Sequence, residues 1–203
     1  MTKLILIIFL IFLLFLLLIL ISIFADYKNK KFTNYIDEQH IAGIIGEEKA
    51  EKLIKSILSK NDLLFTNVEI SFDGRLTELD NVIVNQNGVF IIEIKNYIGK
   101  IVGNEEDYEW LKYKTTQAGN TYKKAVRNPI KQVKRQIYLL ANYLDYYGVK
   151  VWVRGYAYMI HKNSPIKSEN ILQNIEELNR EIHTNRKIKL NKNKINEIKK
   201  ILS

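Results

Sequence analysis

The pattern of apolar and polar positions divides the chain into one long apolar stretch and a series of shorter amphipathic segments. Leu4 to Phe24 spans 21 positions without a charge, and Ser22 is its only polar residue. A helix of that length crosses a hydrocarbon layer of about 30 Å, whereas the apolar region of a signal peptide has only about 7–15 residues. We therefore predict a single-pass anchor in the cell membrane. Lysines that follow the stretch, at positions 28, 30 and 31, predict that the rest of the chain lies in the cytoplasm.

The other periodicities predict helices and strands in alternation. Apolar residues at helical spacing predict a helix from about residue 44 to 59, with Glu47 near its apolar side and Glu48 pointing away. Asn128 and Pro129 predict the start of a helix that ends near Gly148. Alternation predicts strands at residues 65–72, on both sides of a turn between residues 77 and 95, and at residues 100–102, 108–113 and 149–160. The pattern indicates an α/β domain with a central mixed β-sheet flanked by helices.

The two strands between Thr77 and Lys95 carry the most informative pattern. The dipeptide Asn87-Gly88 between them is typical of a two-residue type I′ hairpin turn. With that turn Asp80 lies opposite Lys95, and with a four-residue turn it lies opposite Glu93. Either register places four charged residues on one side of the hairpin: Glu78, Asp80, Glu93 and Lys95. The other side then carries Leu79, Ile83, Phe90, Ile92 and Ile94.

Charged side chains on such apolar strands are costly unless they are paired, bind a cation or open to a cleft. Two carboxylates can hold Mg²⁺ and leave coordination positions for water and a phosphate oxygen, while a nearby lysine orients that water. A cross-strand salt bridge on a solvated sheet face is the alternative. Periodicity and charge alone leave both interpretations open.

The order of residues around the hairpin resembles the nuclease-related domain (NERD) family of the restriction-endonuclease-like, or PD-(D/E)XK, nuclease superfamily. Asp80 followed by Glu93-Ile94-Lys95 is similar to the superfamily motif, and Gly88 to Lys95 is similar to the second strand of the NERD pattern. Other matching residues are Gly46-Glu47, Gly99, Trp110, Asn128-Pro129 and Gln132. The resemblance covers about residues 44 to 160 and implies a restriction-endonuclease-like fold.

This resemblance implies divalent-metal-dependent hydrolysis of phosphodiester bonds in nucleic acid, with DNA favoured over RNA. The implied catalytic residues are Glu47, Asp80, Glu93 and Lys95. Asp80, Glu93 and the backbone carbonyl of Ile94 would bind Mg²⁺ or Mn²⁺, with Glu47 and Glu78 as further candidate ligands. A non-catalytic, membrane-tethered module that binds nucleic acid or protein is the alternative, because a fold does not determine a function.

A basic segment follows the hairpin. Residues 110–144 contain no Asp or Glu, and they contain eight basic residues: Lys112, Lys114, Lys123, Lys124, Arg127, Lys131, Lys134 and Arg135. Such clustering suits a polyphosphate backbone, and an anionic lipid surface is the rival partner. We predict that these residues and Gln132 bind nucleic acid. Tyr113 and Tyr122 lie among them and could stack on bases, whereas Trp110 is predicted to be a core anchor.

Composition narrows the chemistry further. The chain of 203 residues has no cysteine, which excludes disulfides, thiolate zinc sites and cysteine nucleophiles. The three histidines show no metal-ligand spacing. We predict four parts: a membrane anchor at residues 1–25, a juxtamembrane tether at 26–43, a nuclease-like domain at 44–160, and a C-terminal helical extension at 161–203 that packs on the domain.

Overall fold

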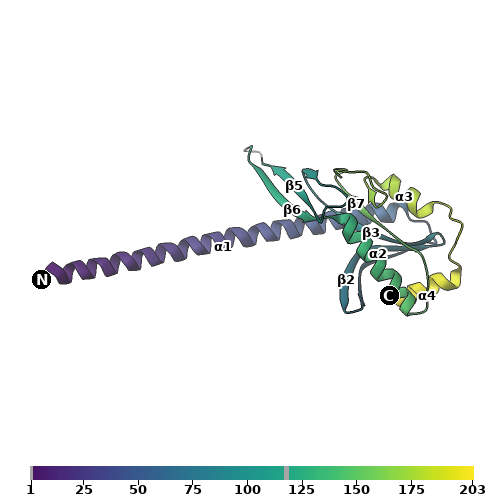
Figure 1. Cartoon of the computed structure of the whole chain (residues 1–203), viewed down its shortest axis with the longest axis horizontal. Coiled ribbons are helices and arrows are strands. Elements are labelled where there is room, and N and C mark those ends of the chain that lie inside the picture. The colour runs from purple at the N-terminus through teal and green to yellow at the C-terminus, as the bar shows by residue number, and fades with distance from the viewer. Residues whose placement is uncertain (1, 117–118) are drawn as a thin grey trace. The chain divides into compact units, whose positions relative to one another are not determined.

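The computed structural model describes the backbone of residues 2–116 and 119–203, and the side chains of residues 13–28, 46–116 and 119–203. The chain divides into two compact units, residues 1–44 and residues 45–203. Helix α1 (Thr2–Ile57) forms the first unit and continues into the second (Figure 1).

The first unit contains the predicted anchor and tether. Part of the anchor, residues 4–12, lies outside the side chains that the structure describes, and the apolar side chains from Leu13 to Phe24 are exposed. Within the described residues, no helix has both the length and the apolar character needed to cross a membrane. The expected tether at residues 26–43 is helical backbone within α1. Neither proline nor glycine occurs between residues 25 and 42, so nothing there breaks the helix.

The second unit is built on a five-stranded sheet with the order β1-β2-β3-β7-β8. Its strands are β1 (Leu63–Phe72), β2 (Arg75–Asn85), β3 (Gly88–Lys95), β7 (Val153–Met159) and β8 (Ile171–Leu172). The first three strands are antiparallel to one another, whereas β3, β7 and β8 are parallel. Parallel neighbours need a crossover, and the chain between β3 and β7 makes it through a second sheet and helix α2 (Pro129–Tyr146). The predicted central mixed sheet is confirmed.

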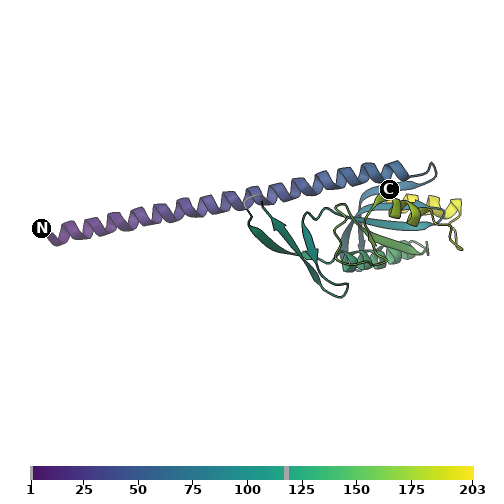
Figure 2. The same ribbon diagram turned by 90° about the horizontal axis from the view of Figure 1, so that it is seen from above.

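Helices cover both faces of the five-stranded sheet, with α2 and the end of α1 on opposite sides (Figure 2). On one face, Ile91 shares a core with α2 and with Ile198 of α4 (Lys192–Leu202). On the other face, Phe90 shares a core with the end of α1 and with Ile182 of α3 (Ile175–His183). Residues beyond position 160 therefore contribute to both cores.

A second sheet has the order β4-β5-β6 and consists of β4 (Lys100–Val102), β5 (Glu109–Thr115) and β6 (Thr121–Arg127). Directly opposed residues share a face, so the register defines two faces. The inner face carries Ile101 and Trp110, which are buried in a core with α2 and β7. The outer face carries Lys100, Tyr113 and Lys123. The sequence predicts β4 and β5 but not β6, because the segment TYKKAVR is almost fully exposed and shows no apolar alternation.

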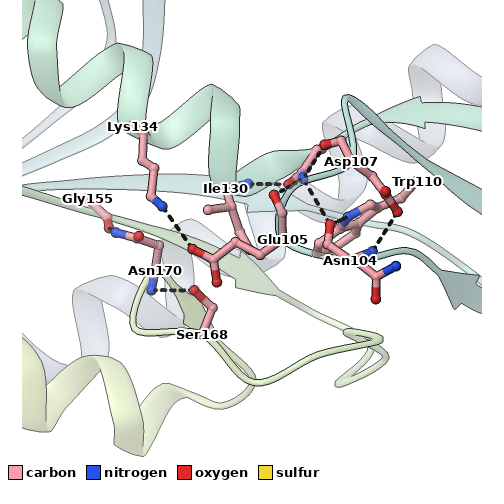
Figure 3. A network of polar contacts seen from close by, with 10 residues as sticks. Asn104, Glu105, Asp107, Trp110, Ile130, Lys134, Gly155, Ser168 and Asn170 are labelled. Atoms are coloured by element: carbon pink, nitrogen blue, oxygen red, sulfur yellow. Dashed lines mark hydrogen bonds and ion pairs between the residues drawn. The ribbon is translucent and has the colours of Figure 1, made fainter.

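A polar network joins the start of α2 to the loop before β5 (Figure 3). The side-chain oxygen of Asn128 accepts the Ile130 N–H at 2.9 Å, which confirms Asn128 as the N-cap. Trp110 is fully buried and its Nε1 donates to the Asn104 carbonyl at 2.8 Å, so its prediction as a core anchor is also confirmed. The Asn128 Nδ2 donates to three backbone carbonyls, those of Asn104, Glu105 and Asp107.

The turn between β2 and β3 differs from the expected type I′ turn. Asn85 pairs with Gly88, so the two loop residues are Gln86 and Asn87, and the register shifts by two residues from the one expected for an Asn87-Gly88 loop. A shift of two leaves every side chain on its own side of the sheet. The reason is tertiary, because the side-chain nitrogens of Asn85 and Asn87 both donate to the Ile182 carbonyl of α3. The Asn85 oxygen also accepts the Asn87 N–H at 2.8 Å.

Candidate active site

The candidate site lies where β2 and β3 separate. Their backbone pairing extends from the turn to Asn81 and Ile92, and it stops there. At the next position the Asp80 carboxylate accepts the Ile94 N–H at 2.7 Å. In a continued antiparallel ladder a main-chain carbonyl of β2 would accept that N–H. The bond therefore fixes the Asp80 carboxylate beside the end of β3.

The strands β1 and β2 are irregular at the same point. Their pairing skips Asn67 and Asp80, and Asn67 has a positive φ of 52°. Leu79 lies in the core on the α2 side together with Val82, although strict alternation would put these two residues on opposite faces. The prediction that Leu79 shares a side with Ile83 and Phe90 is therefore wrong, because the irregularity changes the phase of β2 beside Asp80.

Glu93 of β3 is the buried centre of the site. It is only 3% exposed, and its carboxylate accepts three side-chain hydrogen bonds. Lys95 Nζ and Gln132 Nε2 donate to Oε1, the first at 2.6 Å, and Gln136 Nε2 donates to Oε2 at 2.6 Å. A buried carboxylate is tolerated when it is paired and its lone pairs are used in this way. The contacts hold Glu93 in one orientation.

Electrostatic interactions link the three residues of the motif. Burial, followed by the charge of Glu93, raises the pKa of Asp80 to about 7, although the Ile94 N–H and Lys95 act in the opposite direction. Burial is the largest single effect on the Lys95 ammonium and acts to lower its pKa. The charges of Glu93, Tyr97 and Asp80, together with the hydrogen bond to Glu93, outweigh it, so the pKa is raised. Lys95 is therefore held as a cation beside the two carboxylates.

Two further acids from the sequence analysis have different positions. Glu47 has an exposed side chain, and its charge contributes to the raised pKa of Asp80. Gly46 beside it lets α1 approach the loop after Lys95, since a Cβ there would come within 2.6 Å of the Asn96 Nδ2. Glu78 is exposed, and its backbone carbonyl accepts from Gln136 at 3.3 Å. In the described part of the chain, no group of three or more His, Cys, Asp or Glu side chains is arranged to hold a metal ion.

The two glutamines of α2 take roles that the sequence did not distinguish. Gln132 was expected at the nucleic-acid surface, and the structure places its amide on Glu93. Gln136 is 1% exposed and also donates to Glu93. Their spacing of four residues puts both amides on one side of the helix, one turn apart. That spacing, directed at a buried acid, is the signal that could have found Gln136.

Tyr97 connects the site to the second sheet. Its hydroxyl donates to the Arg127 carbonyl at 3.4 Å, and the Lys112 ammonium lies 5.8 Å from the centre of its ring. Burial is the main cause of the raised Tyr97 pKa, with smaller effects of Lys95, Glu93 and Arg127. Tyr97 thus lies between the Glu93–Lys95 pair and the basic strands.

The eight basic residues of the basic segment do not form one continuous cluster. The inner face carries Lys112, Lys114 and Lys124. Burial lowers the pKa of Lys112, and the charges of Lys124 and Lys114 act in the same direction. The outer face carries Lys123 and Arg127, and Arg127 lies opposite Glu109. Helix α2 carries the exposed Lys131, Lys134 and Arg135. Of these, Lys134 forms a 2.8 Å ion pair with Glu105, which the basic composition of the segment did not suggest (Figure 3).

Comparison with known proteins shows the family of this chain. The family described as nuclease-related domain (NERD) matches residues 42–160, which is more than half of the chain. The protein therefore belongs to the NERD family, as the resemblance of its motifs indicated. An uncharacterized protein of Bacillus anthracis is 32% identical over 109 residues, which make up 51% of this chain and 49% of that protein. The match thus spans about half the length of that relative. No solved structure matches the chain.

Proposed function

We propose that this protein is a divalent-metal-dependent nuclease that hydrolyses phosphodiester bonds, with DNA as the favoured substrate. One observation carries the proposal: Asp80, Glu93 and Lys95 meet where β2 and β3 separate, and burial with mutual repulsion raises the pKa of Asp80 to about 7. Membership of a nuclease-related family supports the same reaction class.

The donor set at the site suits Mg²⁺ or Mn²⁺. Asp80 and Glu93 supply carboxylate oxygens, which these hard cations prefer. The Ile94 N–H points to Asp80, and since the N–H and C=O of one strand residue point to the same edge, the Ile94 carbonyl is a further candidate ligand. Burial and the neighbouring Glu93 raise the pKa of Asp80, so a bound cation would favour its ionised form. A cation bound there would polarise a phosphoryl oxygen and lower the pKa of a bound water.

The residues of the chain then have distinct roles. Lys95 is held as a cation by Glu93, so it can orient an attacking water or stabilise negative charge that develops in the transition state. Gln132 and Gln136 keep the Glu93 carboxylate from rotating. Glu47 can complete the site from α1, while Glu78 is the weaker candidate, since its carboxylate is exposed and its carbonyl accepts from Gln136. The basic residues of β5, β6 and α2 hold the phosphate backbone.

Cleavage and binding must be measured separately to test this proposal. With Mg²⁺ or Mn²⁺, the full chain should cleave DNA, and Asp80→Asn or Lys95→Gln should slow cleavage by roughly 10²–10³-fold. In EDTA the same variants should bind DNA nearly as well as the wild type, since the lost interactions act mainly in the transition state. Glu47→Gln should slow cleavage, whereas the matched change Glu48→Gln on the same helix should not. Binding without cleavage of any DNA or RNA would instead establish the non-catalytic binding module.

We also propose that residues 4–24 anchor the protein in the cell membrane with the second unit in the cytoplasm. The support is the uncharged stretch of 21 residues with lysines on one side. After alkaline carbonate washing of cell membranes, the protein should stay in the pellet, and protease added outside intact cells should leave residues 45–203 uncut. Release by carbonate would refute the anchor, and cleavage from outside would refute the orientation.

A further inference from the structure

We propose that the outer face of the β4-β5-β6 sheet binds single-stranded nucleic acid, with one base stacked on Tyr113 between Lys100 and Lys123. The inference rests on the proposed function for the class of ligand. It adds that the nucleic acid is single-stranded and that the outer face of the β4-β5-β6 sheet selects this form.

The register of the sheet places these three side chains in one row. Lys100 of β4 is directly opposite Tyr113 of β5, and Tyr113 is directly opposite Lys123 of β6. Neighbouring strands are about 4.8 Å apart, so the two lysines start from backbone positions about 10 Å apart with the aromatic ring between them. A cation on each side of an aromatic ring is the arrangement that stacks a base and contacts the phosphates that flank it.

The row borders an open depression of about 520 Å³. Its lining comes from all three strands and the preceding loop: Gly99, Lys100, Val102, Tyr113, Thr115 and Thr121. Gly99 has a positive φ of 99°, and a Cβ there would come within 2.2 Å of the Tyr113 carbonyl oxygen. Glycine at this position therefore lets the loop close tightly against β5, which leaves one wall of the depression free of a side chain. The volume falls within the range of small-ligand sites.

The core of the domain does not use this row of side chains. The inner face buries Ile101 and Trp110, so the sheet is already attached through its other side. Among the described residues, Lys100 and Lys123 form no ion pair, and the Tyr113 side chain makes neither a hydrogen bond nor a ring contact. Lys100 and Tyr113 therefore line the depression with unused interaction capacity, and Lys123 lies next to Tyr113 in the register.

The depression is also within reach of the candidate active site. Lys100 follows Lys95 by five positions, which limits the separation of their Cα atoms to about 18 Å. The connecting loop is fixed, because Asn163 Nδ2 donates to the carbonyls of Tyr97 and Gly99 at 2.5 and 2.7 Å. A strand of a few nucleotides held on Tyr113 is therefore long enough to reach Lys95. Bases within an intact duplex are stacked on one another and cannot reach the ring, so this surface selects single strands.

A binding experiment with the full chain in EDTA tests the inference without any cleavage. The probe is a short single-stranded oligonucleotide with one 2-aminopurine, whose fluorescence is quenched on stacking. Tyr113→Ala should weaken its binding at least fivefold and abolish most of the quenching, whereas Tyr113→Phe should keep both. The matched control is Tyr146→Ala, since Tyr146 is 75% exposed at the end of α2 and lies outside the second sheet. It should bind within twofold of the wild type.

Three results would overturn the inference: equal binding by wild type and Tyr113→Ala, equal affinity for an abasic oligonucleotide, or equal losses from Tyr113→Ala and Tyr146→Ala. Thermal unfolding of each variant shows whether a loss reflects folding, and Tyr113→Phe separates ring stacking from the hydroxyl. Duplex DNA distinguishes this inference from the proposed function. Duplex binding and cleavage that do not depend on Tyr113 would leave the nuclease proposal intact, whereas a wild-type protein that binds neither form would remove both.

Discussion

The candidate active site and the β4-β5-β6 sheet both concentrate charge, but the charges are buried and hydrogen-bonded in the first and exposed in the second. Glu93 is 3% exposed and accepts hydrogen bonds from a cation and two amides. Lys100 and Lys123 project from an exposed face and form no ion pair within the described residues. A buried charge must be held by the protein, and it is then oriented for chemistry. An exposed charge costs little and stays available for a ligand.

Matched replacement of two lysines should show the largest difference between the regions. Lys95→Met leaves the Glu93 carboxylate buried without its cation, and we expect the free energy of unfolding to fall by roughly 3 kcal/mol. Lys100→Met removes an exposed lysine without an ion-pair partner and should change that free energy by less than about 0.5 kcal/mol. Urea unfolding of both variants in metal-free buffer measures the two values. Equal losses would mean that the Glu93–Lys95 pair contributes no more than a surface charge.

Asp80 should give the site a pH dependence that the second sheet lacks. Its pKa of about 7 in the folded protein lies above the usual 3.8, so the folded state keeps a proton that the unfolded chain has lost. Without metal, the free energy of unfolding should therefore fall as pH rises from about 4 to about 7, by up to roughly 4 kcal/mol from this group.

Asp80→Asn tests this assignment because it removes the titrating group and keeps its shape. The difference between wild type and Asp80→Asn in urea unfolding, measured at pH 5 and at pH 8 in EDTA, isolates the contribution of Asp80. Mg²⁺ should restore stability to the wild type at pH 8, since a cation favours the ionised carboxylate. A difference that is the same at both pH values would contradict the raised pKa.

The smallest expected effect is a change in the salt dependence of nucleic-acid binding, caused by lysines on the inner face of the β4-β5-β6 sheet. Replacing Lys114 and Lys124 with Ala should lower the slope of log K against log salt by about 0.7 per lost phosphate contact on single strands, or about 0.9 on duplex. Stability should change little, because Lys114 and Lys124 are both exposed. Fluorescence anisotropy from 50 to 200 mM salt measures the slope, and Lys199→Ala is the control, since Lys199 is an exposed residue of α4 outside the basic segment. An unchanged slope for the double variant would exclude the inner face from the interface.

Local patterns predicted the parts of this fold that local interactions determine. Asn128 is an N-cap because its side chain satisfies the helix that follows directly. The hairpin that brings Asp80 and Glu93 together follows from two apolar strands around a short turn. A register shift of two residues did not disturb this clustering, because side chains alternate with period two.

Distant contacts determine what the sequence did not show. The turn at Asn87 is set by the Ile182 carbonyl, which lies 95 residues further along the chain. Leu79 changes face because β1 and β2 are irregular together at Asn67 and Asp80. Gln136 reads as an ordinary helix residue until Glu93 is placed beside it by the packing of α2 on the sheet. In each case the conformation depends on a residue of another helix or strand. The sequence next to the affected residue does not contain that contact.

The hydrogen bonds from Asn85 and Asn87 to the Ile182 carbonyl also set an order of events during protein synthesis. Both amides are buried in the finished fold, and they lack this acceptor until α3 has left the ribosome. The hairpin that carries Asp80 and Glu93 therefore reaches its final form only after residues 161–203 are largely made. The candidate site is therefore incompletely arranged in the nascent chain, and its geometry is completed together with the fold.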